Sequence, residues 1–158
     1  MQHATMTEAT FIEDATLRSA SRPRGGPIQR MLVSFSVAYF AAALATDLAY
    51  WQMPDVMWER FSIWLITAGL ITAGLAVIAY VIDLAARRRI DMPVWPSVVG
   101  YALAVLLALT NAFVHSRDGY TAVVPSGLML SATVILILFA TAWVDRAFAN
   151  RLVLEHKI

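Results

Sequence analysis

Long apolar runs, almost free of charged residues, recur along the chain from residue 31 onward. Four such runs are each about 20 residues long, and they cover Met31–Tyr50, Phe61–Ile82, Val94–Val114 and Ala122–Val144. A helix that rises about 1.5 Å per residue needs this length to cross about 30 Å of hydrocarbon. Because a helix satisfies its own backbone hydrogen bonds, each run predicts a transmembrane helix rather than a strand.

The connections between the four runs are short and carry helix-breaking residues, namely Pro54, Pro93, Pro96, Gly119 and Pro125. Short connections make successive helices antiparallel neighbours. The predicted fold is therefore all-α, an integral membrane four-helix bundle with up-down-up-down topology. Residues 31–158 form its single transmembrane domain.

Residues 1–30 have a different character, being rich in Ser, Thr, Ala, Glu and Arg. They contain no apolar core or cleavage site of a signal peptide, and Glu8, Glu13 and Asp14 argue against a transit peptide. We expect this segment to be a disordered polar tail on the cytoplasmic side. A role as an arm that docks on a partner is the alternative.

Composition agrees with a membrane protein. Of the 158 residues, 59% are hydrophobic and 15% are charged, whereas globular chains are about 45–50% apolar and about 25% charged. A soluble domain of this size would lack polar residues to cover its surface. The absence of cysteine excludes disulfides, thiolate metal sites and cysteine nucleophiles. A formal net charge of +1 gives no reason to expect nucleic acid as a partner.

The distribution of Lys and Arg predicts an orientation. Ten of these residues lie in the tail, the second connection and the C-terminal segment, against Arg60 and Arg117 alone in the first and third connections. Basic residues concentrate on the cytoplasmic side of membrane proteins. We therefore expect a multi-pass protein of the bacterial inner membrane with both termini in the cytoplasm.

Small residues suggest how the helices pack. The third run carries Gly100, Ala104, Ala108 and Ala112 at four-residue spacing, and the first carries Ala41, Ala45 and Ala49. In lipid, helices associate where small side chains let their backbones approach. We expect these stripes to pack inside the bundle, with a homo-oligomer interface as the alternative.

Polar residues at membrane depth are the first candidates for function, because burying an ionisable group there is costly. Asp47 lies within the first run, and Asn111 and His115 lie near the same membrane face in the third. These two helices run parallel, so the three side chains reach a similar depth. We expect them to form either a site for a proton or small ligand, with Asp47 as acceptor, or a structural hydrogen bond between helices. A further alternative is that Asp47 lies at the interface and reaches water.

Charged residues mark the opposite, inner face. Asp83 and Asp145 end the second and fourth runs, and Asp83 has the spacing of a helical ion pair with Arg87. The run Arg87, Arg88 and Arg89 suits anionic headgroups or the determination of topology. We interpret these residues as anchors at the inner face.

No pattern of catalytic or cofactor-binding residues is present. The three histidines are His3, His115 and His156, and the predicted topology separates His115 from the other two, which argues against bis-histidine haem ligation. No metal-ligand cluster, phosphate-binding glycine loop or nucleophile with a nearby base is evident. We expect no enzymatic activity and no cofactor.

The stretch Gly26-Pro27-Ile28-Gln29-Arg30-Met31-Leu32-Val33-Ser34-Phe35 resembles the His-Pro-Ile-His-Pro-Met-Leu-Val-His-Phe opening of the bacterial membrane-protein family called domain of unknown function 2231. The likeness extends over about residues 25–156, through Thr46-Asp47-Leu48, Trp64-Leu65, Gly69, Asp83, Asn111 and His156. It implies a four-helix inner-membrane protein without an established activity. Gly26, Gln29 and Ser34 occupy the family's histidine positions, so a polar function would rest on Asp47, Asp83 and Asn111.

Two functions are compatible with this pattern. The sequence favours a small non-enzymatic accessory or structural subunit that packs in the lipid bilayer with itself or with a larger membrane complex. The alternative is a proton- or small-ligand-handling membrane protein that uses a polar site near Asp47, Asn111 and His115.

Overall fold

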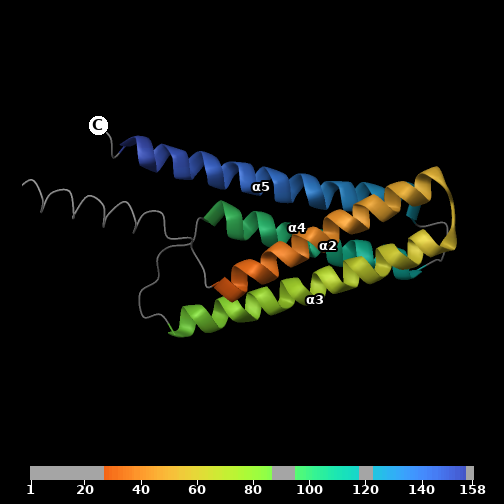
Figure 1. Cartoon of the computed structure of the whole chain (residues 1–158), viewed down its shortest axis with the longest axis horizontal. Helices are drawn as coiled ribbons and strands as arrows, with labels where there is room; N and C mark the ends of the chain where they lie inside the picture. The colour runs from red at the N-terminus through yellow and green to blue at the C-terminus, as the bar shows by residue number, and fades with distance from the viewer. Residues whose placement is uncertain (1–26, 87–94, 118–122, 156–158) are drawn as a thin grey trace, which may run out of the picture.

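Four long helices make up the computed structural model, which describes residues 27–86, 95–117 and 123–155 (Figure 1). The helices are α2 (Pro27–Gln52), α3 (Val56–Ala86), α4 (Trp95–Arg117) and α5 (Leu128–Glu155), with a short wide turn, η2 (Val123–Gly127), directly before α5. Each of the four is long and apolar enough to cross a membrane. The predicted all-α membrane fold is confirmed for the described residues.

The helices are antiparallel to their chain neighbours and form a ring. The most extensive contacts are between α2 and α3 and between α4 and α5, and contacts of α2 with α5 and of α3 with α4 close the ring. Figure 1 shows that α2 and α4 end, and α3 and α5 begin, at one end of the bundle. We call this end the hairpin end and the opposite one the termini end.

The helices extend beyond the predicted runs. α2 begins at Pro27, inside the segment expected to be a tail, because proline without an amide hydrogen is well suited to a first helical turn. The remainder of the predicted tail, residues 1–26, lies outside the described residues. α3 begins at Val56 rather than at residue 61, which places Glu59 inside a helix.

Local capping and proline chemistry set the helix starts at the hairpin end. The Asp55 side chain accepts a hydrogen bond from the Met57 amide at 2.9 Å, so that Asp55 caps α3. In η2, Val124 has an extended backbone (φ −121°, ψ 124°), as expected for a residue that precedes a proline. The kink therefore lies inside η2, near its start.

Buried positions repeat every three or four residues on each helix. On α3 they are Glu59, Ser62, Ile66, Gly69, Ala73 and Ala76. The corresponding residues are Ser36, Phe40, Ala43 and Asp47 on α2, Ala104, Ala108, Asn111 and His115 on α4, and Gly127, Ser131, Val134 and Leu138 at α5. A repeat that averages about 3.5 residues is typical of left-handed bundles with interlocking side chains. We call these positions the seam.

The seam is small and polar, whereas the outside of the bundle is large and apolar. Large hydrophobic side chains are exposed along every helix, and Trp64, Trp95 and Phe139 are each at least 65% exposed. In water this arrangement would be unfavourable, since it exposes large apolar patches. In a bilayer it places the large side chains against lipid and the small ones where helices meet.

The two small-residue stripes differ in burial. Ala104 and Ala108 are buried in α4, and a methyl group on Gly100 would collide with Thr141 of α5. The expectation for α2 was wrong, because Ala41 and Ala45 are exposed. Strict four-residue spacing drifts around a helix relative to the 3.5-residue seam, and on α2 the seam runs through Phe40 and Ala43 instead.

An apolar cluster fills the seam on the termini side of the polar residues. It contains Phe40, Ala104, Ala108, Val134 and Leu138. The Phe40 ring lies directly on Gly69 of α3, where an added Cβ would come within 2.6 Å of the ring atom Cε1. Gly69 therefore allows α2 and α3 to approach closely, while the nearby Gly74 faces open space.

The contrast between these two glycines predicts the outcome of a matched pair of substitutions. Gly69→Ala should destabilise the protein by about 1–3 kcal/mol, because the new methyl group displaces the Phe40 ring. Gly74→Ala should be neutral or stabilising by up to about 1 kcal/mol, since alanine is the better helix former. Thermal unfolding in a mild detergent measures both, and equal midpoints would contradict the assigned contact.

Candidate functional site

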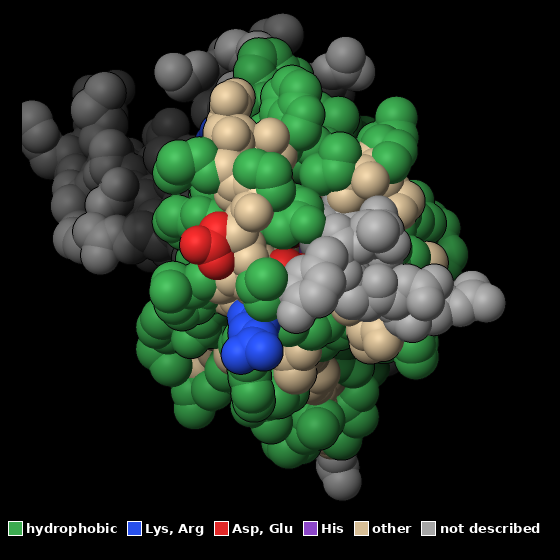
Figure 2. Space-filling view, turned by 90° about the vertical axis from the view of Figure 1, so that its right-hand side faces the viewer, with side chains coloured by type: hydrophobic (Ala, Val, Ile, Leu, Met, Phe, Trp, Pro, Cys, Tyr) green, Lys and Arg blue, Asp and Glu red, His purple; other side chains and the backbone are tan. Residues whose placement is uncertain are grey.

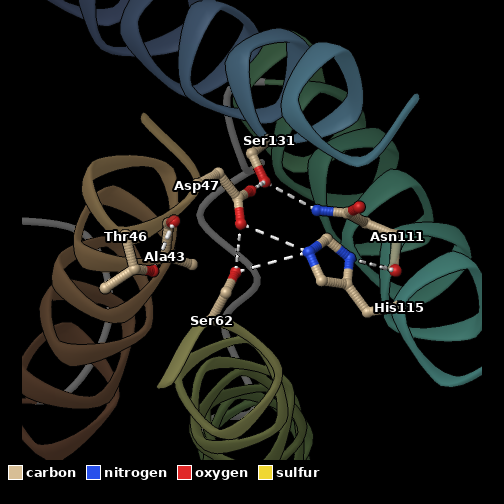
Figure 3. A network of polar contacts seen from close by, with 7 residues as sticks. All are labelled: Ala43, Thr46, Asp47, Ser62, Asn111, His115 and Ser131. Atoms are coloured by element: carbon tan, nitrogen blue, oxygen red, sulfur yellow. Dashed lines mark hydrogen bonds and ion pairs between the residues drawn. The ribbon is translucent and has the colours of Figure 1, made fainter. Parts of the chain in front are cut away.

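Buried polar side chains from all four helices meet near the hairpin end (Figure 3). Asp47 comes from α2, Ser62 from α3, Asn111 and His115 from α4, and Ser131 from α5. All five are among the buried polar residues of the structure, and Asp47 is completely shielded from solvent. We call this group the polar network.

The Asp47 carboxylate accepts hydrogen bonds from three other helices. Its Oδ1 accepts from the Ser62 hydroxyl at 2.5 Å and lies 3.2 Å from His115 Nε2. Its Oδ2 accepts from the Ser131 hydroxyl, also at 2.5 Å. Hydrogen bonds to an ionised oxygen are shorter and stronger than neutral ones, so these donors offset much of the cost of burying a carboxylate.

The contacts of His115 define where its ring hydrogens lie and how many protons it shares with Asp47. Nδ1 lies 3.0 Å from the Asn111 backbone carbonyl oxygen, which can only accept, so Nδ1 carries a hydrogen. Nε2 faces a carboxylate oxygen, and that contact is attractive only with a proton between the two atoms. The Asp47–His115 pair therefore shares one proton, on Nε2 in the ion pair or on Oδ1 in the neutral pair.

Asn111 extends the polar network toward α5. Its Nδ2 donates to the Ser131 hydroxyl at 2.7 Å, and Ser131 uses its own hydrogen on Asp47. Because the Ser131 hydrogen is used on Asp47, the Asn111 side chain must present its NH₂ group to Ser131, and this fixes the orientation of the Asn111 amide. The Asn111 Oδ1 points away from Asp47 (Figure 3) and is buried without a hydrogen-bond partner among the described residues.

Gly127 makes room for the imidazole. A Cβ at this position would come within 2.6 Å of His115 Cε1. The ring is thus held between the α5 start on one side and Asp47 and Ser62 on the other, and its orientation is determined by packing as well as by hydrogen bonds.

A second carboxylate lies close to the polar network. Glu59 is on the α3 seam, one turn nearer the hairpin end than Ser62, and only 8% exposed. Figure 2 shows this end of the molecule, where apolar side chains surround a few charged ones.

The arrangement differs from that of a catalytic triad, although Ser62, His115 and Asp47 lie together. In a triad the carboxylate binds one imidazole nitrogen and the serine hydroxyl the other. Here Ser62 and Asp47 both face Nε2, with Ser62 Oγ 3.5 Å away, and the Ser62 hydrogen bonds to the carboxylate. The geometry suits the holding of a proton rather than the activation of a nucleophile.

Metal binding has no support within the described residues, where no group of three or more His, Asp or Glu side chains is arranged to hold an ion. A smaller polar contact joins α2 to α4 closer to the termini end, where Ser36 Oγ and the Tyr101 hydroxyl are 2.6 Å apart. Ser36 has no exposed surface, so this contact is a structural link between helices.

The structure brings the three predicted polar residues together, and their role as a site stays a prediction. Sequence reasoning missed Ser62, Ser131 and Glu59. Serines are common in apolar helices and bond readily to their own backbone, so only a shared seam position distinguishes these two. Glu59 lies before Phe61, where the second predicted run begins, so the hydropathy pattern gave no sign that it is inside a helix.

The predicted inner-face anchors are only partly described. Asp145 on α5 accepts a short hydrogen bond from the Ser97 hydroxyl on α4, which ties these helices together at the termini end. Asp83 is half-buried near the end of α3 and has an interaction partner. Arg87, Arg88 and Arg89 lie outside the described residues.

These features define a multi-pass membrane protein, built as a four-helix bundle with a buried polar network near one end. The sequence matches the family described as predicted membrane protein (DUF2231) over residues 25–157, which is almost the whole chain. The chain belongs to this family, and the resemblance seen in its sequence is confirmed. Neither a curated protein nor a solved structure matches it significantly.

The polar network predicts a strong dependence of stability on Asp47. Asp47→Ala should destabilise the protein by about 3–5 kcal/mol, because it leaves His115 and two serine hydroxyls buried without their acceptor. The matched control is Thr46→Ala, since the Thr46 hydroxyl donates to the Ala43 carbonyl of its own helix. This substitution should change stability by about 0.5 kcal/mol or less. Unfolding in detergent measures both, and similar losses would contradict the assigned role of Asp47.

Proposed function

We propose that this chain is a non-enzymatic, proton-handling membrane protein in which Asp47 and His115 bind one exchangeable proton. The observation that carries the proposal is the 3.2 Å contact between His115 Nε2 and Asp47 Oδ1, which is fully buried and requires a proton between the two atoms. Ionisable groups at membrane depth face the bundle interior and commonly mark proton relays. The pair has both properties.

Ser62 supports a reversible exchange. With the proton present, its hydroxyl donates to Asp47 Oδ1. When the proton leaves, the bare Nε2 faces the carboxylate, and the Ser62 hydroxyl, 3.5 Å from Nε2, can turn its hydrogen toward the nitrogen. Ser62 has one hydrogen and can donate it to Oδ1 or to Nε2 but not to both, so the pair without its shared proton lacks one hydrogen bond.

Proton exchange at this pair would act on the packing of all four helices. Loss of the proton leaves one net negative charge in a buried site, where an uncompensated charge is costly. The carboxylate is bonded to α3, α4 and α5 simultaneously. The helix packing at the hairpin end would therefore loosen when the Asp47–His115 pair lacks its shared proton and tighten when the pair holds it, as in other histidine-based switches.

The proposal includes an orientation. The excess of Lys and Arg in the tail, the second connection and the C-terminal segment favours the termini end on the cytoplasmic side. The polar network then lies near the outer face of a bacterial inner membrane. In this orientation the protein would respond to acidity outside the cytoplasm.

An accessory or structural role is the second candidate. It is favoured by the complete hydrogen bonding of Asp47, since both carboxylate oxygens have donors and a satisfied network makes a bundle rigid. In that case the Asp47–His115 pair would only hold the helices together, while the apolar exterior packs against a larger membrane complex or a second copy of the chain.

Titration of the histidine rings separates the two candidates. The full chain, labelled with ¹⁵N in its histidine side chains and placed in lipid nanodiscs, has three histidines, and the spectrum of His115→Gln identifies the signals of His115. For a proton-handling pair we expect both His115 nitrogens to shift between about pH 4 and pH 9. In Asp47→Asn, the negative charge that stabilises a doubly protonated ring is lost, and we expect a neutral ring that carries a single hydrogen.

His3 and His156 in the same sample provide internal controls, because neither belongs to the polar network. If their signals titrate while those of His115 stay constant over the whole range, the pair is structural and the proton-handling proposal is wrong.

A further inference from the structure

Access to the polar network is closed from the termini end. On that side the seam is filled by Phe40, Val134 and Leu138 together with small alanines, all of them buried. A packed apolar layer holds neither water nor groups that carry protons. A proton that reaches the Asp47–His115 pair must therefore come from the hairpin end.

Among the described residues, one ionisable side chain occupies the seam between Ser62 and the hairpin end. Glu59 lies three residues before Ser62 on α3, so the two side chains share a helix face. It is 8% exposed, whereas Asp47 and the His115 side chain are fully buried. Glu59 is thus placed on the seam between Ser62 and the hairpin end, with a small part of its surface reaching the exterior.

Other titratable groups at this end are less well placed. Arg60 follows Glu59 but points to the exposed side of α3, and Asp55 is exposed and caps that helix. Tyr50 on α2 is half-buried and has its own interaction. Of the α4 side chains that the structure describes at this end, the titratable one is His115 itself, and from η2 and the first turns of α5 the described residues contribute hydroxyls such as Ser131 rather than titratable groups.

We propose that Glu59 is the proton-access group of the polar network, which exchanges protons between the aqueous phase at the hairpin end and the Asp47–His115 pair. This inference rests on the proposed function. It adds the side from which protons reach the pair and the residue that carries them. A carboxylate at the boundary of a buried site is suited to this task, because it can take a proton from water and hand it to a neighbouring base.

The exchange step is a balanced proton transfer. On unloading, the N–H bond at His115 Nε2 breaks and an O–H bond forms on the Glu59 carboxylate, with bridging water carrying the proton between the two groups. Glu59 then releases that proton to the aqueous phase and is again a carboxylate. His115 remains with its hydrogen on Nδ1, bonded to the Asn111 carbonyl oxygen, and loading is the reverse of these steps.

The test measures how fast the His115 Nε2 hydrogen exchanges with water. The full chain in lipid nanodiscs is labelled with ¹⁵N in its histidine side chains, and the transfer of saturation from water is followed by NMR. Glu59→Gln keeps the shape of the side chain but removes its proton-carrying group. We expect exchange to slow at least about 10-fold, with unchanged His115 chemical shifts, since a positioned acid or base contributes at least that factor to proton transfer.

Asp55→Asn is the matched control, because it removes an acidic group at the same end while asparagine caps a helix equally well. It should leave the exchange rate unchanged, and Glu59→Asp should retain exchange because the carboxyl group is kept. Unchanged exchange in Glu59→Gln, or an equal loss in Asp55→Asn, overturns the role of Glu59 while the proposed function stands. A His115 that does not titrate in the unmodified protein overturns both.

Discussion

The burial of one carboxylate constrains the whole bundle. Asp47 has no exposed surface, and a buried charge is tolerated only when donors surround it. Those donors come from α3, α4 and α5, two of them at 2.5 Å. A shift of one residue in the register of any of these helices would remove a donor, so the polar network sets how the four helices lie relative to one another, which nonspecific apolar contacts in lipid do not.

The rest of the seam follows from the membrane environment. Because lipid is as apolar as a leucine side chain, helices gain little from hiding large residues from it. The seam accordingly uses Ala, Gly and Ser, and the large side chains face outward. A few larger side chains, Phe40 and Ile66 among them, are buried as well, and the Phe40 ring is accommodated by Gly69 on the neighbouring helix. The outcome is a bundle with an apolar layer toward the termini end and a polar layer toward the hairpin end.

This layering makes a one-sided proton site a coherent proposal for a member of a family without an established activity. The polar network holds a carboxylate and an imidazole in contact, a buried apolar cluster lies on its termini side, and Glu59 lies on the seam toward the hairpin end. A chain with these features would sense protons rather than conduct them. Its readout would be the packing of the hairpin end, where Gly127 and η2 hold the imidazole in place.

The sequence by itself determined the four transmembrane helices, because length and hydropathy decide membrane insertion one segment at a time. It also brought Asp47, Asn111 and His115 to a common depth, since the first and third helices run parallel. It did not determine which face of each helix is buried, because helices that are apolar on every side carry no amphipathic signal. Only the tertiary structure decided that Ser62 and Ser131 belong to the polar network and that Glu59 lies beside it. It also decided that Ala41 and Ala45 are exposed. The physical reason is that one buried carboxylate needs donors, and this need selects the helix faces that meet.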